Sequence, residues 1–217
     1  MAQKLEKRIK VFRSAAIPAS LNVLLKGQLN YLQNYFTVTA IASEGPDLLE
    51  VKVRENVAVK SIEIQRKISL FKDFFSLVNL FIFFKKEKPH IVHSITPKAG
   101  LISMIAAKLA GVPIRMHTFT GLIFPSKTGI MQQLLIKMDK LLCWAATNIY
   151  PEGNGVKNDL INFNITSKPL KVLANGNVNG IDLEFFSKTT VSAIKQNQLK
   201  QDLGIRVNDF VFIFRGR

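Results

Sequence analysis

The chain has 217 residues, 47% of them hydrophobic, which is enough for one large domain with an apolar core, or for a domain plus part of another. Its single cysteine, Cys143, excludes a disulfide framework and a cysteine-based zinc site, and fits a reducing compartment. Thirty Lys and Arg against fifteen Asp and Glu give a net charge of +15, which attracts nucleic acid, anionic lipid or phosphorylated substrates alike.

Short β-branched or aromatic runs alternate with longer helical patterns along most of the chain. Strands are expected near 9–15, 36–42, 57–64, 90–94, 114–118, 148–150 and 171–173. Helices are expected near 21–33, 47–54, 99–109 and 130–146, together with a Phe-rich helix that runs to about 86. This alternation predicts an α/β fold, a doubly wound parallel sheet with helices on both faces. Ligands of such sheets bind beyond the carboxyl ends of the strands, which here are followed by loops at 14–22, 43–47, 94–98, 118–127, 151–157 and 174–182.

The apolar stretch 68–84 is too often interrupted by polar residues to cross a bilayer. It carries two apolar helical stripes. The first stripe is Ile68, Phe71, Phe75, Val78 and Ile82, and the second is Leu70, Phe74, Leu77 and Phe81. One stripe should pack on the sheet. The other is either core as well or a membrane contact beside the basic cluster Lys85, Lys86 and Lys88.

The pattern changes after Ser187. Residues 191–203 predict an isolated polar helix with Gly204 after its end, and 210–214 predict a new apolar strand. We therefore expect one domain over 1–187, followed at 188–217 by a linker helix and the first strand of a second, truncated domain. No apolar segment follows the charged first ten residues, so no secretory signal is expected and the predicted location is cytoplasmic.

Several common nucleotide-binding motifs are missing from the sequence. It has no G-x-G-x-x-G after the first strand and no G-x-x-x-x-G-K-[ST], which argues against a dinucleotide dehydrogenase and a P-loop enzyme. It also has no Asp-x-Asp, the carboxylate pair with which metal-dependent sugar transferases hold a nucleotide diphosphate. A sugar transferase with this sequence would hold its phosphates without a metal.

Three segments could carry chemistry. At 93–100, Ser94 or Thr96 can cap a helix that starts at Pro97, and Lys98 with free backbone N–H groups would form an anion site; the alternative is only a well-capped helix. At 115–121, His117 is either catalytic or a structural strand histidine. At 175–182, alternating Asn and Gly form a tight loop that turns the chain or reads a ligand.

These segments together resemble a known family. The ordered set is Val92-His-Ser-Ile-Thr-Pro-Lys-Ala-Gly100, Ala110-Gly-Val-Pro-Ile-Arg115, Thr118-Phe-Thr-Gly-Leu122 and Ala174-Asn-Gly-Asn-Val-Asn-Gly-Ile-Asp182. It resembles bacterial glycosyltransferases of family four, which have the GT-B fold of two Rossmann-like domains. Within that family it is similar to enzymes that build capsular polysaccharide, lipopolysaccharide O-antigen or protein-linked glycans on polyprenyl diphosphate.

The resemblance implies retaining, metal-independent transfer from a nucleotide sugar, a UDP-sugar, with no cofactor. The transfer would take place in a cleft between an acceptor-side N-terminal domain and a nucleotide-binding C-terminal domain. Thr120 occupies the position of a histidine in many relatives, so the implied catalytic residues are Thr120 and His117. The implied acceptor-binding residues are Ser14, Ser20, Asn22, Ser94, Thr96, Lys98, Thr118 and Gly121. The implied donor contacts are Asn175, Gly176 and Arg217.

The partners that follow are a nucleotide-sugar donor, a polyprenyl-linked saccharide and the anionic inner face of the plasma membrane, where the chain would be peripheral. Two other functions are compatible with parts of the sequence. A nucleic-acid-binding module is supported by the charge alone, and its aromatics should alternate with basic residues on one face, whereas here they lie in apolar stripes. A non-catalytic interaction subunit would need a separate donor-binding chain.

Overall fold

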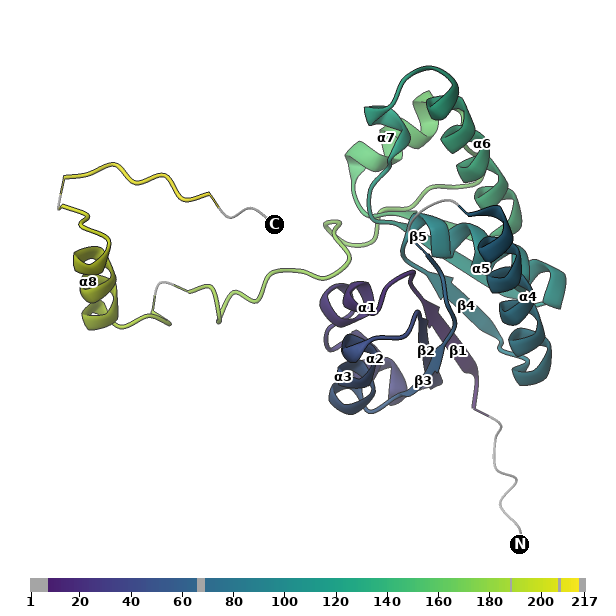
Figure 1. The fold of residues 1–217 in the computed structure, drawn as a ribbon, viewed down its shortest axis with the longest axis horizontal. Coiled ribbons are helices and arrows are strands. Elements are labelled where there is room, and N and C mark those ends of the chain that lie inside the picture. The colour runs from purple at the N-terminus through teal and green to yellow at the C-terminus, as the bar shows by residue number, and fades with distance from the viewer. Residues whose placement is uncertain (1–7, 66–68, 188, 207, 215–217) are drawn as a thin grey trace, which may run out of the picture. The chain divides into compact units, whose positions relative to one another are not determined.

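The computed structural model describes residues 8–65, 69–187, 189–206 and 208–214. Its contacts divide the chain into two units, Met1–Asn179 and Gly180–Arg217. The first unit contains a parallel sheet in the order β3-β2-β1-β4-β5-β6 (Figure 1). The strands are β1 Lys10–Ser14, β2 Thr37–Ala42, β3 Ala58–Ser61, β4 Ile91–Ser94, β5 Ile114–Phe119 and β6 Asn148–Pro151. The predicted doubly wound α/β fold is confirmed.

Helices cover both faces of the sheet, as Figure 1 shows. The helices on one face are α1 Pro18–Leu24, α2 Gln28–Gln33 and α3 Pro46–Glu55, and those on the other are α4 Leu70–Glu87, α5 Pro97–Ala110 and α6 Gly129–Ala145. Side chains along the β1 segment enter different cores, because Phe12 of β1 packs in the cluster with α4 and α5, whereas Ala15, directly after β1, packs in the cluster with α1. In a sequence, central strands that are buried on both faces appear as continuous apolar runs.

The predicted helix over 21–33 is two helices. Gly27 separates them with a φ of 78°, a left-handed conformation that glycine adopts without strain. The carboxylate of Glu55, at the end of α3, accepts the backbone N–H of Gly27 at 2.9 Å and that of Asn30 at 3.1 Å. Glu55 is buried, so the six-residue α2 is capped at its N-terminus by a side chain from another helix.

Two further predictions in this unit were wrong. Helix α7, Asn154–Asn162, follows β6 where we expected a loop. The strand expected at 171–173 does not form, and its neighbourhood contributes only an isolated bridge between Leu170 and Ile149. The short 3-10 helix η1, Phe124–Ser126, lies between β5 and α6.

Neither of the two predicted apolar stripes is the buried face of helix α4. The helix buries Ser76, Leu80 and Phe84 against the domain. The first stripe points outward, since Phe71, Phe75 and Ile82 are exposed; Ile68 lies outside the described residues. The second stripe is divided: Leu70 and Phe74 are exposed, whereas Leu77 and Phe81 pack against the core. Among the helices that the structure describes, none is long and apolar enough to cross a membrane.

The second unit contains helix α8, Ala193–Asp202, whose first turn is capped by the Ser192 hydroxyl. Gly204 follows with a φ of 65°, the left-handed conformation predicted for it. The strand predicted at 210–214 is not formed, because a strand requires a neighbour for its backbone and the described part of this unit supplies none. The domain boundary between 187 and 188 stays a prediction.

Candidate functional site

The strand order of the sheet reverses between β1 and β4, which makes this the switch point of the fold. The chain leaves β1 toward α1 on one face and leaves β4 toward α5 on the other. The loops that follow β1 and β4 are joined by the Thr96 hydroxyl, which accepts a hydrogen bond from the backbone N–H of Ala16 at 2.9 Å. Pro97 begins α5 as predicted, but the Thr96 side chain binds the neighbouring loop and does not cap the helix. Ligands of open α/β sheets bind in the crevice at such a switch point.

A row of polar side chains crosses the sheet just below this edge, on the face that carries α1, α2 and α3. Nη1 of Arg13 lies 2.9 Å from Nδ1 of His93, and Nε2 of His93 lies 2.8 Å from the Thr118 hydroxyl. The ring of Tyr150 lies 6.3 Å from that of His93 between centroids. We call Arg13, His93, Thr118 and Tyr150 the polar row; they come from β1, β4, β5 and β6.

The polar row holds a buried positive charge. Arg13 is 6% exposed, its Nε has no hydrogen-bond partner, and no ion pair joins it to a carboxylate within the described residues. Burial lowers the pKa of Arg13 to about 10, which leaves the guanidinium protonated at neutral pH. Burial, and then the charge of Arg13, hold the pKa of His93 well below its usual value, so the imidazole is neutral. Its Nδ1 therefore accepts from Arg13 and its Nε2–H donates to Thr118.

Sequence reasoning missed Arg13. The available signal was an arginine inside the otherwise apolar run Lys10-Val-Phe-Arg-Ser14 of a central strand. An unpaired charge is rarely buried in such a place unless something compensates it, so the position points to an anionic ligand.

His117 lies on the opposite face, beneath α5, and is fully buried. The hydroxyl of Ser94, also fully buried, lies 2.7 Å from its Nδ1, and its Nε2 has no hydrogen-bond partner. Burial lowers the pKa of His117 to about 3. Gly100 of α5 packs on the ring so closely that a β-carbon there would lie 2.4 Å from Cε1. Because the ring has no access to solvent, the structure supports the structural alternative for His117 and not the predicted catalytic role. Ser94 is buried together with His117.

Three other predicted acceptor contacts lie around the first loop. Ser14 is fully buried, with its hydroxyl lacking a hydrogen-bond partner, and is not accessible to a ligand. The amide of Asn22 donates to Asp47 at 2.8 Å and accepts from Arg54, which ties α1 to α3. Ser20 lies half-buried in the first turn of α1. Of these three, only Ser20 has a partly exposed side chain that is not already engaged in packing the helices.

Thr120, Gly121 and Lys98 lie at the carboxyl edge. The Thr120 hydroxyl donates to the carbonyl of Ile95 at 3.0 Å, which joins the loop after β5 to the loop after β4. Gly121 has a φ of 137° and begins the turn toward η1. Lys98 forms an ion pair with Asp73 of α4 at 2.7 Å, and both side chains are mostly buried. This pair gives Lys98 a role in packing α4 against α5.

The predicted donor contacts Asn175 and Gly176 lie in a loop beside the end of β6. Gly176 has a φ of 90°, and a β-carbon there would lie 2.7 Å from the carbonyl oxygen of Glu152, so only glycine fits. Next to the loop is an open hollow of about 500 Å³, lined by Asn154, Lys157, Lys171 and Asn175 among others. Arg217 lies outside the described residues.

The family model described as "Glycosyl transferase 4-like" matches residues 15–152 of this chain. The chain belongs to this glycosyltransferase family. The match covers the switch point, the polar row from β4 onward and the loops with Thr96 and Thr120. The resemblance inferred from the ordered motifs is thereby confirmed.

Two curated relatives are similar to this glycosyltransferase domain in sequence. The capsular polysaccharide biosynthesis glycosyltransferase CapM of Staphylococcus aureus is 34% identical over 214 residues, which cover 97% of this chain and 54% of that protein. The UDP-Gal:alpha-D-GlcNAc-diphosphoundecaprenol alpha-1,3-galactosyltransferase of Escherichia coli is 35% identical over 153 residues, or 70% of this chain and 38% of that protein. The chain spans about half the length, or less, of these relatives.

Solved structures share the fold. A glycosyltransferase from Rickettsia africae matches 93% of this chain and 51% of its own with a TM-score of 0.65 and 15% identity. HepE of Anabaena, in complex with UDP and glucose, matches 90% of this chain and 50% of its own with a TM-score of 0.68 and 14% identity. The glycosyltransferase domain therefore has the architecture of one half of these proteins.

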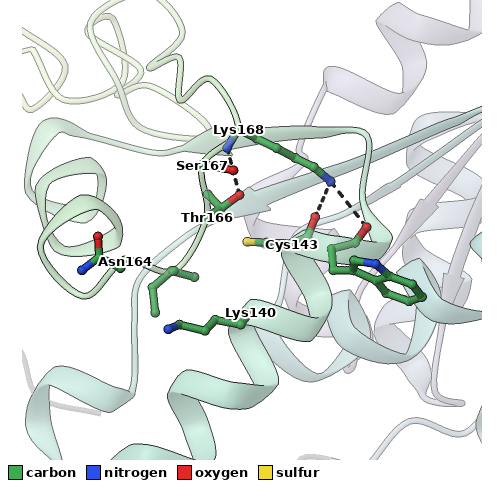
Figure 2. Close-up of a pocket in the computed structure, with 8 residues that line it drawn as sticks. Lys140, Cys143, Asn164, Thr166, Ser167 and Lys168 are labelled. Carbon is green, nitrogen blue, oxygen red and sulfur yellow. Dashed lines mark hydrogen bonds between the residues drawn. The ribbon is translucent and has the colours of Figure 1, made fainter.

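A wider hollow of about 570 Å³ lies between the second half of α6 and the segment after α7 (Figure 2). Its main cation is already engaged, because the Lys168 ammonium donates to the carbonyls of Cys143, at 2.6 Å, and of Ala146, at the C-terminus of α6. Burial raises the pKa of the Cys143 thiol to about 12, so the sulfur is not a nucleophile at neutral pH. This hollow is no candidate for the reaction of the glycosyltransferase, and the switch point remains the candidate site.

Proposed function

We propose that this chain is the acceptor-side part of a glycosyltransferase that moves a sugar from a UDP-sugar to a saccharide carried on polyprenyl diphosphate. Family membership supports sugar transfer, and the S. aureus relative acts in capsular polysaccharide biosynthesis by name. The name of the E. coli relative states both a UDP-sugar donor and a diphosphoundecaprenol-linked acceptor. The domain division at 187 and 188, and a location at the cytoplasmic face of the plasma membrane, belong to the same proposal.

The observation that carries this proposal is the buried charge of the polar row at the switch point. Arg13 supplies a fixed positive charge for a diphosphate at the carboxyl edge, and neutral His93 holds it in place by accepting a hydrogen bond. Such charge-assisted contacts are stronger than neutral ones and need no reorganisation when the ligand binds. Transfer is proposed to be retaining and to need neither metal nor cofactor, since a preorganised arginine supplies charge stabilisation of the kind that a metal would otherwise give.

Other residues of the carboxyl edge complete the proposed site. The hydroxyls of Thr118 and Thr120 lie where strands β5 and β4 end, and they position the sugar or the acceptor. Asn175 and Gly176 offer backbone and amide groups beside the lysine-lined hollow next to β6, which suits the donor side. The proposed roles are therefore hydrogen bonding and electrostatic positioning.

The test is binding of a defined acceptor by the 217-residue chain. The probe is a short-chain polyprenyl diphosphate N-acetylglucosamine, titrated by calorimetry into wild type, Arg13→Met and Arg13→Lys. A charge-assisted contact contributes about 1.5–3 kcal/mol, so Arg13→Met should weaken binding about ten- to a hundredfold. Arg13→Lys should retain part of the affinity, because it keeps the charge.

Folding is controlled in the same experiment. Arg13 has no ion pair with a carboxylate among the described residues, so its replacement by Met leaves no opposite charge stranded, but it removes the hydrogen bond to Nδ1 of His93. The melting temperature of each variant is therefore measured beside that of wild type, and only folded variants are compared. Failure of wild type to bind the probe would refute the proposed acceptor. Equal binding by wild type and a folded Arg13→Met variant would remove the polar row from the site.

A further inference from the structure

Helices α4, α5 and α6 form one layer on the face of the sheet away from the polar row (Figure 1). We call these three helices the outer layer. Helix α5 lies between the other two, packed against both, and the Lys98–Asp73 ion pair fastens the first turns of α4 and α5 together. The sides of these helices that face away from the sheet therefore lie next to one another.

The outward side of the outer layer is unusually apolar for a surface in water. On α4, Phe71 is 83% exposed, Phe74 63% and Phe75 64%. On α6, the outward residues follow helical spacing and are Ile130, Leu134, Leu141 and Trp144, with Ile130 91% exposed and Trp144 60%. A helix in solution normally turns its apolar stripe inward, whereas α4 and α6 each also present one outward.

The charges within the outer layer are mainly positive. Its lysines besides Lys98 are Lys72, Lys85, Lys86, Lys108, Lys137 and Lys140. Of its acidic residues, Asp73 is paired with Lys98 and Glu87 with Lys10. The third is Asp139, whose pKa burial raises to about 7, so that it is only partly ionised at neutral pH. The surface thus combines exposed aromatic and aliphatic side chains with a net positive charge.

We propose that the outward face of α4, α5 and α6 is a membrane-docking surface that inserts its apolar side chains among the head groups of an anionic bilayer. Apolar side chains flanked by lysines are the composition of interfacial membrane-binding helices. Each lysine close to an anionic surface adds to the attraction, and the chain as a whole carries +15. A second copy of the chain is a poorer occupant, because two such faces would oppose positive charge with positive charge.

The docking surface deepens the membrane association that is part of the proposed function, and it has a geometric consequence for the site. The most exposed apolar residues, Phe71 and Ile130, lie in the first turns of α4 and α6. Helices that follow parallel strands begin at the carboxyl edge of the sheet, the edge that holds the switch point. Docking would therefore hold the candidate site close to the head groups, where a lipid-linked diphosphate is found.

The test is flotation of the 217-residue chain with vesicles of phosphatidylcholine alone or mixed with phosphatidylglycerol. Wild type should bind the anionic vesicles at least about tenfold more strongly than the neutral ones, and binding should weaken as salt rises, because the lysines are exposed. The vesicles contain no saccharide acceptor, so a failure to bind vesicles would not affect the acceptor-binding result. A failure to bind the acceptor would likewise not affect the vesicle-binding result.

Matched variants locate the surface. Phe71→Ser/Phe75→Ser should reduce binding to anionic vesicles about tenfold or more. The control is Tyr31→Ser/Tyr35→Ser on or beside α2, which removes aromatics that are 61% and 60% exposed, and its binding should stay within about twofold of wild type. All these side chains are exposed, so both variants should keep the wild-type melting temperature.

The fluorescence of Trp144 gives an independent measurement of docking, because Trp144 is the only tryptophan of the chain and lies on the docking surface. Its fluorescence should shift to the blue with anionic vesicles and be quenched by lipids brominated near the head group. Unchanged binding by Phe71→Ser/Phe75→Ser, an equal loss in the tyrosine control, or an unquenched Trp144 in bound protein would each overturn the proposal. A wild-type chain that binds no vesicles but forms a dimer, which Phe71→Ser/Phe75→Ser dissociates, would also overturn the proposal. That result would assign the surface to a second copy of the chain.

Discussion

Replacement of Gly100 by alanine should destabilise the domain, although alanine is the better helix former. A β-carbon at this position would lie 2.4 Å from Cε1 and 2.7 Å from Nδ1 of His117, and 2.8 Å from Cδ1 of Leu142. Relief of these contacts requires α5 to move away from the sheet, since His117 is fixed by Ser94 and cannot swing into solvent. Overpacking of this kind costs about 1–3 kcal/mol, and the gain in helix propensity returns about 0.5–1 kcal/mol.

The net loss should be about 1–2 kcal/mol, which lowers the melting temperature by about 2–8 °C in a chain of this size. Thermal unfolding followed by circular dichroism measures it. The matched control is Gly155→Ala in α7, where nothing lies within 4 Å of the new β-carbon, and which should be stabilising by about 0.5–1 kcal/mol. A Gly100→Ala variant that melts at or above the wild-type temperature would show that the described contact between α5 and His117 is wrong.

Two further predictions concern charge. The folded-state pKa of His117 is about 3 against an ordinary 6.5, so unfolded chains take up the proton first and stability present above pH 6.5 is lost as the pH falls toward 3. The part due to His117 is about 2 kcal/mol between pH 6.5 and pH 5, and it should be absent in His117→Gln when urea unfolding is compared at the two pH values. Lys98→Met should lower the free energy of unfolding by about 1–3 kcal/mol, because it leaves Asp73 without its partner, and Lys98→Met/Asp73→Leu should recover part of that loss. Identical urea midpoints for wild type and both variants would contradict the ion pair.

Periodicity was sufficient to predict the order of strands and helices, because a parallel sheet built from crossovers repeats one pattern of apolar runs and amphipathic helices. It failed where a single residue or a distant partner decides the structure. The break at Gly27 depends on a cap from Glu55 of another helix, and the local sequence over 21–33 does not predict it. The short α7 has only Leu160 fully buried, so its apolar pattern is too weak to stand out from a loop.

The candidate site was less accessible to sequence reasoning. The sequence pointed to the carboxyl edge and to the loops after β4 and β5, and the structure places Thr96, Thr118 and Thr120 there. It could not assign His117 or Arg13 to a face of the sheet. Both faces of a central parallel strand are covered, so the alternation that would show which side chains share a face is missing from the sequence. One residue of register separates the buried structural His117 from Thr118 in the polar row.

The cap on α2 has a consequence for the order in which the domain assembles. A helix of six residues is far below the length of about 12–15 that persists alone in water, so α2 gains its stability from what it contacts. The N–H of Gln28 donates to the carbonyl of Leu25, but those of Gly27 and Asn30 depend on the carboxylate of Glu55, which reaches its place when α3 has formed and packed against α1. During folding, α2 should therefore acquire protection against amide hydrogen exchange after α3 and not with α1, even though it follows α1 directly in the chain.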